Sequence, residues 1–326
     1  MYLKVINFGP TIVTGGAGFI GSHLTEKLIS MGEIVTVIDN LSSGNIQNLI
    51  RYKDNKLFNL IETNVNNEQI NFDNIKTVFH LAAYPEVSTG FENPSLAYRE
   101  NVENTFKFLE SIRKSNVKNL VFASSSVVYG EPKTIPTPES YGPLLPISSY
   151  GGSKLACEGL ISSYCNNYGI RCSIVRFANV IGSRSNHGII WDFIQKLLKN
   201  NQSLEILGDG TQSKSYIHVN DCINGILMSL DESGKSIDVY NIGNDDKVDV
   251  MTIAKIVCNT LSLENVKFLT VGGTSDGRGW VGDVKHMLLD TTKLKNLGWT
   301  PKLSSLEAIQ LSSKEILQAI QNNSLD

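Results

Sequence analysis

Short apolar runs alternate with longer segments in which apolar residues recur at helical spacing. Between residues 11 and 176 this alternation is regular, which predicts a parallel, doubly wound α/β sheet of the Rossmann type. The segments between the strands have the period of amphipathic helices. We expect strands at 11–15, 34–39, 57–62, 77–81, 119–124 and 171–176, and helices at 18–31, 94–115 and 149–168.

The alternation breaks down after residue 176. We expect a Rossmann-type domain over 1–176 and a smaller C-terminal α/β substrate domain over 177–326, although 219–242 could return a helix and a strand to the first domain. The first ten residues could form an extra strand or a disordered start. The C-terminal half predicts helices near 188–199, 219–230, 251–262 and 304–321, and strands at 204–207 and 239–242.

Three glycines mark the turn between the first strand and the first helix. Gly15 permits a tight turn, Gly18 allows a pyrophosphate to approach the backbone, and Gly21 allows close packing of helix and strand. Glycines alone also fit a plain strand-to-helix turn. Asp39, however, ends the next strand at roughly the ~20-residue offset where an acid receives the adenosine ribose hydroxyls. Because no Arg lies in 40–48 to pair a 2′-phosphate, we expect NAD rather than NADP.

Composition excludes several other classes of protein. The 326 residues allow two domains, and a net charge of −3 gives no nucleic-acid footprint. Five scattered cysteines without a CxxC pair predict reduced thiols in a cytosol and no zinc site. No apolar run approaches the ~18 residues of a membrane span, and no secretory leader is evident. We therefore expect a cytoplasmic protein with no metal.

A serine-rich strand end and a Tyr/Lys pair carry the candidate chemistry. Ser124, Ser125 and Ser126 follow an apolar run, and Tyr150 and Lys154 lie one helical turn apart on one face. A cation ~4 Å from the phenol at an effective dielectric of ~20 supplies ~4 kcal/mol, or up to ~3 pKa units, although desolvation opposes this. With the nicotinamide charge, Tyr150 could be a base near neutral pH. The alternative is an exposed helix face with a chance pair.

Two further segments allow both a functional and a structural interpretation. Residues 80–83 end a strand, where ligands of open α/β sheets lie, but packing alone would also explain them. Asn101 is a mediocre helix former inside a long predicted helix, and a structural role there is at least as plausible as a catalytic one.

Together these motifs resemble the extended short-chain dehydrogenase/reductase family over nearly the whole chain. The resemblance implies that Tyr150 is the acid/base, that Lys154 binds the nicotinamide ribose and tunes Tyr150, and that Ser125 bonds the reacting oxygen. We expect NAD to contact Gly15, Gly18, Phe19, Ile20, Gly21, Asp39, Asn40, Ser43, Gly44, Asn64, Val65, Leu81, Ala82, Ala83, Asn101, Tyr150 and Lys154.

Within that family the chain is most similar to the sugar-nucleotide epimerases. The segments 176–182, 208–212 and 216–219 match their nucleotide-side motifs. Dehydratases and decarboxylases of the group carry an acid just after the catalytic hydroxyl, where this chain has Ser126 and Val127. The expected substrate contacts are Val87, Ser124, Ser125, Ser126, Tyr150, Asn179, Lys214 and Arg278.

The resemblance therefore implies an NAD-dependent 4-epimerase that interconverts UDP-glucose and UDP-galactose through a transient 4-keto sugar. The alternatives are another sugar-nucleotide reductase or dehydratase, or a non-catalytic dinucleotide-sensing protein. The family is often dimeric through two helices, which here are 94–115 and 149–168, so we expect a homodimer.

The chain departs from the family where the diphosphate is anchored. Lys214 stands at one usual Arg position and Trp280 at the other, with Arg278 two residues earlier between glycines. We expect Lys214 and Arg278 to hold the diphosphate jointly. The alternative is that Arg278 is solvated and Trp280 belongs to the core.

Overall fold

The computed structural model describes residues 8–85, 93–230 and 236–323. Its central sheet consists of β1 (Thr11–Thr14), β2 (Val35–Asp39), β3 (Phe58–Glu62), β4 (Thr77–His80), β5 (Asn119–Ser125), β6 (Arg171–Phe177) and β11 (Ile237–Ile242). The strands run parallel in the order β11-β6-β5-β4-β1-β2-β3. The Rossmann-type doubly wound α/β fold is confirmed. The sequence order reverses between β1 and β4, which is where such sheets bind ligands.

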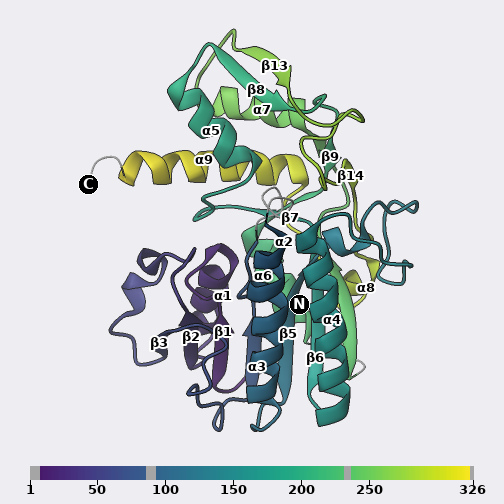
Figure 1. Cartoon of the computed structure of the whole chain (residues 1–326). Helices are drawn as coiled ribbons and strands as arrows, with labels where there is room; N and C mark the ends of the chain where they lie inside the picture. Colours follow the sequence, from purple (N-terminus) through teal and green to yellow (C-terminus); the bar gives the residue numbers. More distant parts are fainter. Residues whose placement is uncertain (1–7, 86–92, 231–235, 324–326) are drawn as a thin grey trace.

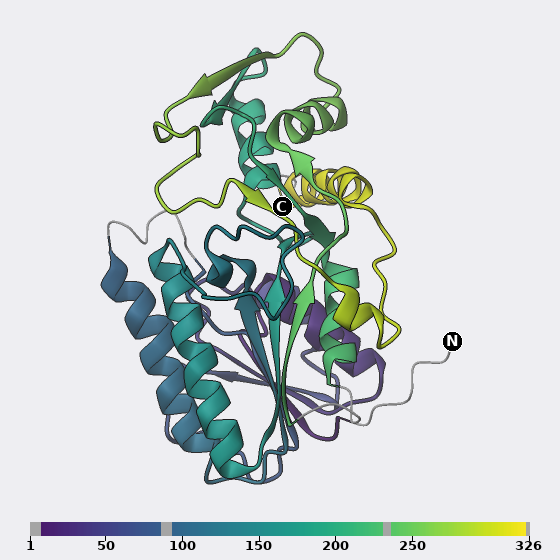
Figure 2. The same cartoon turned by 90° about the vertical axis from the view of Figure 1, so that its right-hand side faces the viewer.

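Helices cover both faces of this sheet (Figures 1 and 2). On one face, α1 (Phe19–Ser30) and α6 (Val219–Ser229) share an apolar core with the strands. On the other face, α3 (Asn104–Ile112) and α4 (Ser149–Tyr168) form a second core. Because β11 pairs with β6 and α6 shares an apolar core with the sheet, these two elements lie with the sheet rather than with the residues around them in sequence.

The helix expected at 94–115 is interrupted. It divides into α2 (Pro94–Ala97), a π-helical turn at Tyr98–Glu103, and α3, which ends at Ile112. Asn101 lies in the π turn, where its side chain bonds to the backbone of Tyr84 and to Ser153 Oγ on α4. These bonds to other elements compete with regular helix geometry, which local propensity could not predict.

Most of the remaining elements build a separate apolar core above the sheet. The predicted helices there are found as α5 (Ile189–Lys199), α7 (Val250–Thr260) and α9 (Ser305–Asn323). The unpredicted α8 (Thr292–Lys295) instead places Leu294 in the core that α1 and α6 share with the sheet. The expected strand at 204–207 is β8 (Ser203–Leu207), which pairs with the unpredicted β13 (Lys267–Val271). Short strands that the sequence did not indicate are β7 (Asn179–Ile181), β9 (Ser213–Lys214), β10 (Tyr216–His218), β12 (Val248–Asp249) and β14 (His286–Met287).

Three 3-10 turns complete the described secondary structure, at Ile46–Asn48, Ile50–Tyr52 and Ser126–Tyr129. Within the described ranges, no helix is both long and apolar enough to cross a membrane. The residues that could form the expected N-terminal strand, 1–7, lie outside the described part of the chain.

Candidate active site

A cavity of about 1050 Å³ lies at the carboxyl ends of the central strands. It extends from the glycine turn after β1 to the segments around β9 and Trp280 in the C-terminal half. Its volume is at the upper end of the roughly 300–1,000 Å³ of typical small-molecule sites, which suits a dinucleotide with a second ligand. Of the cofactor residues expected from sequence, the cavity is lined by Gly15, Gly18, Phe19, Ile20, Gly21, Asp39, Asn40, Ser43, Gly44, Asn64, Val65, Leu81, Ala82, Ala83, Tyr150 and Lys154.

The glycine turn forms a cradle that side chains would fill. Gly15 has φ +68°, and a Cβ there would lie 2.8 Å from the backbone nitrogen of Ala82. A Cβ on Gly21 would lie 2.1 Å from the carbonyl oxygen of Gly15. Helix α1 starts at this turn with no side-chain cap and no acidic residue in its first turn. Its free N–H groups and positive dipole end are therefore available to a phosphate.

Asp39 lies at the end of β2, on the rim of the same cradle. Its two oxygens accept hydrogen bonds from the backbone N–H groups of Ala17 and Leu41, at 2.9 Å each. These bonds fix the carboxylate while leaving lone pairs for ribose hydroxyls. Gly44 packs against it so closely that a Cβ would lie 2.8 Å from an Asp39 oxygen. The donor set of cradle and acid fits a dinucleotide without a 2′-phosphate.

Ser125, Tyr150 and Lys154 meet beside this cradle. Ser125 ends β5, and Tyr150 and Lys154 lie on α4, whose N-cap residue is Ser148; the Ser148 hydroxyl accepts a hydrogen bond from Gly151 N–H. Lys154 Nζ donates to the Ala123 carbonyl at 2.8 Å and lies 5.8 Å from the centre of the Tyr150 ring. All three residues border the cavity, so the expected catalytic set is brought together.

The electrostatics of Tyr150 differ from the sequence-based expectation. Burial raises the pKa of its phenol above the ordinary value, and a hydrogen bond with the Ser125 hydroxyl opposes this only in part. Burial also lowers the pKa of Lys154 to about 8, against the opposing effects of Cys157 and Glu158. Desolvation of the phenolate outweighs the hydrogen bond with Ser125, so the pKa of the phenol lies above its ordinary value and not below it.

Ser124 is held by a buried ion pair behind the strand end. Its hydroxyl donates to Glu158 at 2.5 Å, and Arg176 donates twice to the same carboxylate, at 2.9 and 2.6 Å. The Arg176 guanidinium also stacks 4.7 Å from the centre of the Tyr129 ring. Ser124 borders the cavity, but its hydroxyl is already committed to Glu158. Ser126 and Asn179 also border it, and the Asn179 amide donates to the Ser215 carbonyl.

The two expected diphosphate anchors are placed differently. Lys214 borders the cavity, 5.7 Å from the Trp280 ring, and its ammonium donates to Asp283 at 2.5 Å. Arg278 is not among the residues that line the cavity. Its guanidinium is paired with Asp276 and Glu131 and donates to the Asp283 carbonyl.

Two other expected contacts are not placed in the cavity. Asn101 is buried behind it, where its amide joins the loop after β4 to Ser153. Val87, an expected substrate contact, lies outside the described residues.

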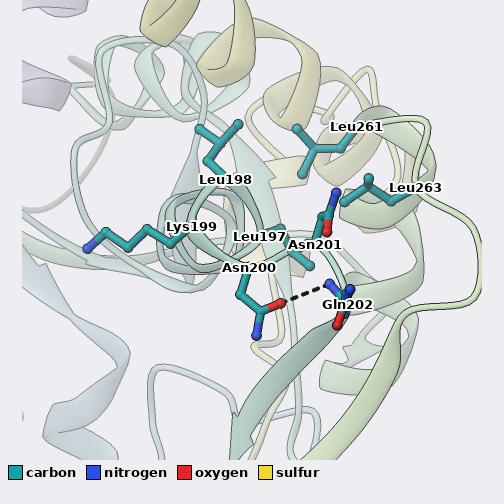
Figure 3. Close-up of a pocket in the computed structure, with 8 residues that line it drawn as sticks. All are labelled: Leu197, Leu198, Lys199, Asn200, Asn201, Gln202, Leu261 and Leu263. Carbon is teal, nitrogen blue, oxygen red and sulfur yellow. Dashed lines mark hydrogen bonds between the residues drawn. The ribbon is translucent and has the colours of Figure 1, made fainter.

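A second, smaller hollow lies on the outer side of the C-terminal half, where α5 and α7 end (Figure 3). It has a volume of about 430 Å³ and no carboxylate, thiol or imidazole among its lining residues, which are Leu197, Leu198, Lys199, Asn200, Asn201, Gln202, Leu261 and Leu263. The larger cavity is therefore the candidate active site.

Comparison with known proteins agrees with this geometry. A family model described as "NAD dependent epimerase/dehydratase family" matches residues 11–243. The chain belongs to the NAD-dependent epimerase/dehydratase family. The expected extended short-chain dehydrogenase/reductase relationship is thereby confirmed, and NAD is the family's cofactor.

Individual relatives of this family member differ in activity. A Methanocaldococcus jannaschii protein named "Putative UDP-glucose 4-epimerase" is 35% identical, over 96% of this chain and 98% of its own length. A crystal structure of a UDP-galactose 4-epimerase is 40% identical, with a TM-score of 0.83, over 95% of this chain and 99% of that one. UDP-glucuronic acid decarboxylase 2 of Arabidopsis thaliana is 30% identical, over 95% of this chain and 68% of its own length.

Sequence reasoning missed one large part of this epimerase/dehydratase cavity. The loop after β7 and the start of α5 line it, yet they carry no glycine fingerprint or catalytic motif. The nearest sequence signal was the match to the family's nucleotide-side motif at 176–182, directly before this loop. The missed lining residues of this segment are Ser185, Asn186, His187, Gly188, Ile189, Ile190, Asp192, Phe193 and Lys196.

The cysteines and metal-type ligands of this family member form no further centre. All five cysteines are buried and unpaired. In the parts of the chain that the structure describes, no group of three or more His, Cys, Asp or Glu side chains could hold a metal ion.

Proposed function

We propose that this protein is a nucleotide-sugar 4-epimerase that interconverts UDP-glucose and UDP-galactose. The observation that carries the proposal is the Ser125/Tyr150/Lys154 set at the cavity, in which Ser125 is directly followed in sequence by Ser126 and Val127. Neither of these two has a carboxyl group. Expelling the C6 hydroxyl in a dehydration needs an acid, whereas inverting C4 needs only one group that takes and returns a proton.

Each residue of the set has a distinct task. Tyr150 takes the proton of the C4 hydroxyl and later returns it. Ser125 bonds to the same oxygen, and Lys154 places a cation beside the nicotinamide ribose and the phenol. NAD, which the glycine turn and Asp39 would hold, would supply a reversible hydride acceptor for C4 of the sugar. Because burial raises the pKa of Tyr150, the positive charge of the oxidised nicotinamide would help Tyr150 to lose its proton.

Lys214 supports the second half of this cycle. The keto sugar must turn about its diphosphate link, so the nucleotide has to stay fixed while the sugar moves. Lys214 is the described cation beside Trp280 at the end of the cavity away from the glycine turn. We assign the diphosphate to it. Arg278 as a second anchor remains a hypothesis that requires its guanidinium to leave Asp276 and Glu131.

A panel of substrates tests the activity. The purified protein is incubated with UDP-galactose, UDP-N-acetylglucosamine, UDP-glucuronic acid and dTDP-glucose, and products are identified by proton NMR. We expect UDP-glucose from UDP-galactose, and loss of kcat by ~10²–10⁴-fold in Tyr150→Phe. A decarboxylated or dehydrated product would assign the protein to another branch of its family. If every substrate were untouched and NAD still bound, a dinucleotide sensor would be the better interpretation.

We also propose that two copies of the chain associate through α3 and α4. The two helices lie side by side at the outside of the molecule (Figure 2). Phe106 on α3 and Tyr168 on α4 are exposed, and Tyr164 lies against both rings. Exposed aromatic groups of this kind are enriched in interfaces between chains.

The buried cysteines, none of which forms a disulfide, also support our proposal that the protein acts in a reducing cytoplasm.

A further inference from the structure

The segment 182–188, between β7 and α5, is held from both sides of the cavity. Four of its residues, 185–188, line the cavity. The two residues before them, Ser183 and Arg184, contact two helices instead, α1 and α9. None of the family motifs identified in the sequence includes these two residues.

On the cofactor side, the contacts are all to α1. Arg184 donates to Ser22 Oγ at 3.2 Å and to Glu26 Oε2 at 2.6 Å. Ser183 Oγ lies 3.2 Å from Nε2 of His23. These three partners lie within about one turn of the same helix, which begins at the glycine turn of the cofactor site.

On the substrate side, the contacts are to α9 and to the start of α6. Ser183 N–H donates to Glu315 Oε2 at 2.9 Å. His218 Nδ1 accepts from Asn220 N–H, so the proton of a neutral His218 is on Nε2, which lies 3.2 Å from the same Glu315 oxygen. Ser183 thus joins α9 through its backbone and α1 through its side chain. Both views show α9 above α1, on the C-terminal side (Figures 1 and 2).

The backbone of this segment is constrained. Arg184 has φ +65°, a left-handed conformation that is unfavourable for a non-glycine residue. Gly182 passes so close to α6 that a Cβ would lie 2.6 Å from Val219 Cγ1. A strained residue persists only where its surroundings fix it. Here the surroundings are the hydrogen bonds of the Arg184 side chain to α1.

We propose that Ser183 and Arg184 are positioning residues. They fix the position of the nucleotide-sugar half of the cavity relative to the cofactor half. The proposal rests on the proposed epimerase activity, in which the nucleotide must stay fixed against NAD while the keto sugar turns. A misplacement of about 1 Å in such a site can cost about 10²-fold. The Arg184–Glu26 pair is partly exposed, and pairs of this kind stabilise a fold little. Loss of this ion pair should therefore change substrate binding and turnover more than the free energy of unfolding.

Glu26 offers a matched control. The same carboxylate also pairs with Arg51, which is exposed and makes no contact with 182–188 among the described interactions. Arg184→Met and Arg51→Met each remove one arginine from Glu26, but only the first releases the segment. Arg184→Lys tests whether charge alone suffices, and Glu26→Arg with Arg184→Glu restores the pair in reverse.

The test compares these variants in three measurements. For Arg184→Met we expect kcat/KM for the nucleotide sugar to fall about tenfold or more, through a lower kcat as well as a higher KM. We also expect more reduced cofactor to remain on the protein during turnover, seen by its near-ultraviolet absorbance. This follows because C4 has lost its hydride to NAD⁺ and its hydroxyl proton to Tyr150, and the keto nucleotide escapes before both return. Arg51→Met should behave as wild type, and the reversed pair should recover in part.

Equal behaviour of Arg184→Met and Arg51→Met would overturn the proposal, as would a reversed pair no better than Arg184→Met. Binding of UDP, measured by calorimetry on the NAD-loaded protein, does not depend on the reaction. If wild type turned over no nucleotide sugar, the proposed function would fail, yet weaker UDP binding in Arg184→Met than in Arg51→Met would still support the positioning role. Unchanged UDP binding in both would contradict it.

Discussion

At the scale of single residues, burial decides the protonation of the groups behind the cavity. His80 is fully buried at the end of β4, where it stacks on Phe108. Thr14 Oγ1 accepts the N–H groups of Leu81 and Ala82, so its own hydrogen is donated to His80 Nδ1. His80 is therefore the neutral Nε2–H tautomer. Burial, with the nearby Lys154 charge, lowers the pKa of His80 to about 3.

This shift predicts a pH-dependent stability. Below pH 6.5 His80 becomes protonated in the unfolded state, whereas in the folded state it stays neutral down to about pH 3. The free energy of unfolding therefore falls as pH drops from 6.5 towards 3. At two units below 6.5 the loss from His80 is about 2–3 kcal/mol. His80→Gln keeps one donor and one acceptor but cannot titrate. We expect its free energy of unfolding in urea to fall less than that of wild type between pH 7 and that point; an equal fall would contradict the assignment.

The two diphosphate candidates can be separated by residue substitution. Both cations are ion-paired, Lys214 with Asp283 and Arg278 with Asp276 and Glu131, but only Lys214 lines the cavity. We expect Lys214→Met to raise KM for the UDP-sugar about tenfold or more with kcat little changed, since the diphosphate is not altered by the reaction. Arg278→Met should stay within about twofold. Steady-state kinetics at low and high salt measure both, and a comparable rise in KM for Arg278→Met would favour the sequence-based hypothesis that the two residues hold the diphosphate jointly.

At the scale of elements, α4 is tied to β6 by the buried Arg176–Glu158 pair. Removing one partner leaves an uncompensated charge in the core, which costs about 3–5 kcal/mol, while replacing both by apolar groups is often neutral. We expect Glu158→Leu to be destabilised by that amount. The double variant Glu158→Leu/Arg176→Met should recover most of it. Urea unfolding measures both; a double variant as unstable as Glu158→Leu would show that the pair is not the cause.

Elements with their own periodic pattern could be predicted, and elements that depend on distant partners could not. The six Rossmann strands and helices α1 and α4 match their apolar patterns within one or two residues at each end. The π turn at 98–103 was missed because it depends on Asn101 reaching Tyr84 and Ser153. Strands β7 and β10 consist of three residues each and pair only with one another, so no local pattern marks them.

The candidate site likewise combines residues that local sequence signals predict with interactions that depend on distant contacts. Glycine spacing, Asp39 and the Tyr150/Lys154 pair are local signals, and the structure gathers these residues in one cavity. The raised pKa of Tyr150 is not a local signal, because it reflects how deeply the folded chain buries the phenol. The pairing of Arg278 with Glu131 is likewise set by a contact between residues far apart in sequence.

At the scale of the whole molecule, the proposed dimer predicts a change of mass. Phe106 on α3 is 43% exposed and lies beside Tyr164 of α4. We expect wild type to have the mass of two chains by light scattering, and Phe106→Glu to have the mass of one, because a charge in the centre of an apolar interface is left unpaired. Leu198→Glu on the far half of the molecule, where Leu198 is 52% exposed, is the control and should stay dimeric. A wild-type protein with the mass of one chain would contradict the proposed dimer.

The central claim is that one bound NAD carries the C4 hydrogen away from the sugar and back. It is tested most directly with UDP-galactose deuterated at C4, incubated with the purified protein without added NAD. Tyr150 exchanges only a hydroxyl proton with its surroundings, so the deuterium should be retained at C4 of the UDP-glucose formed, as read by NMR and mass spectrometry. Loss of deuterium to solvent, or a product without its C6 hydroxyl, would contradict the account.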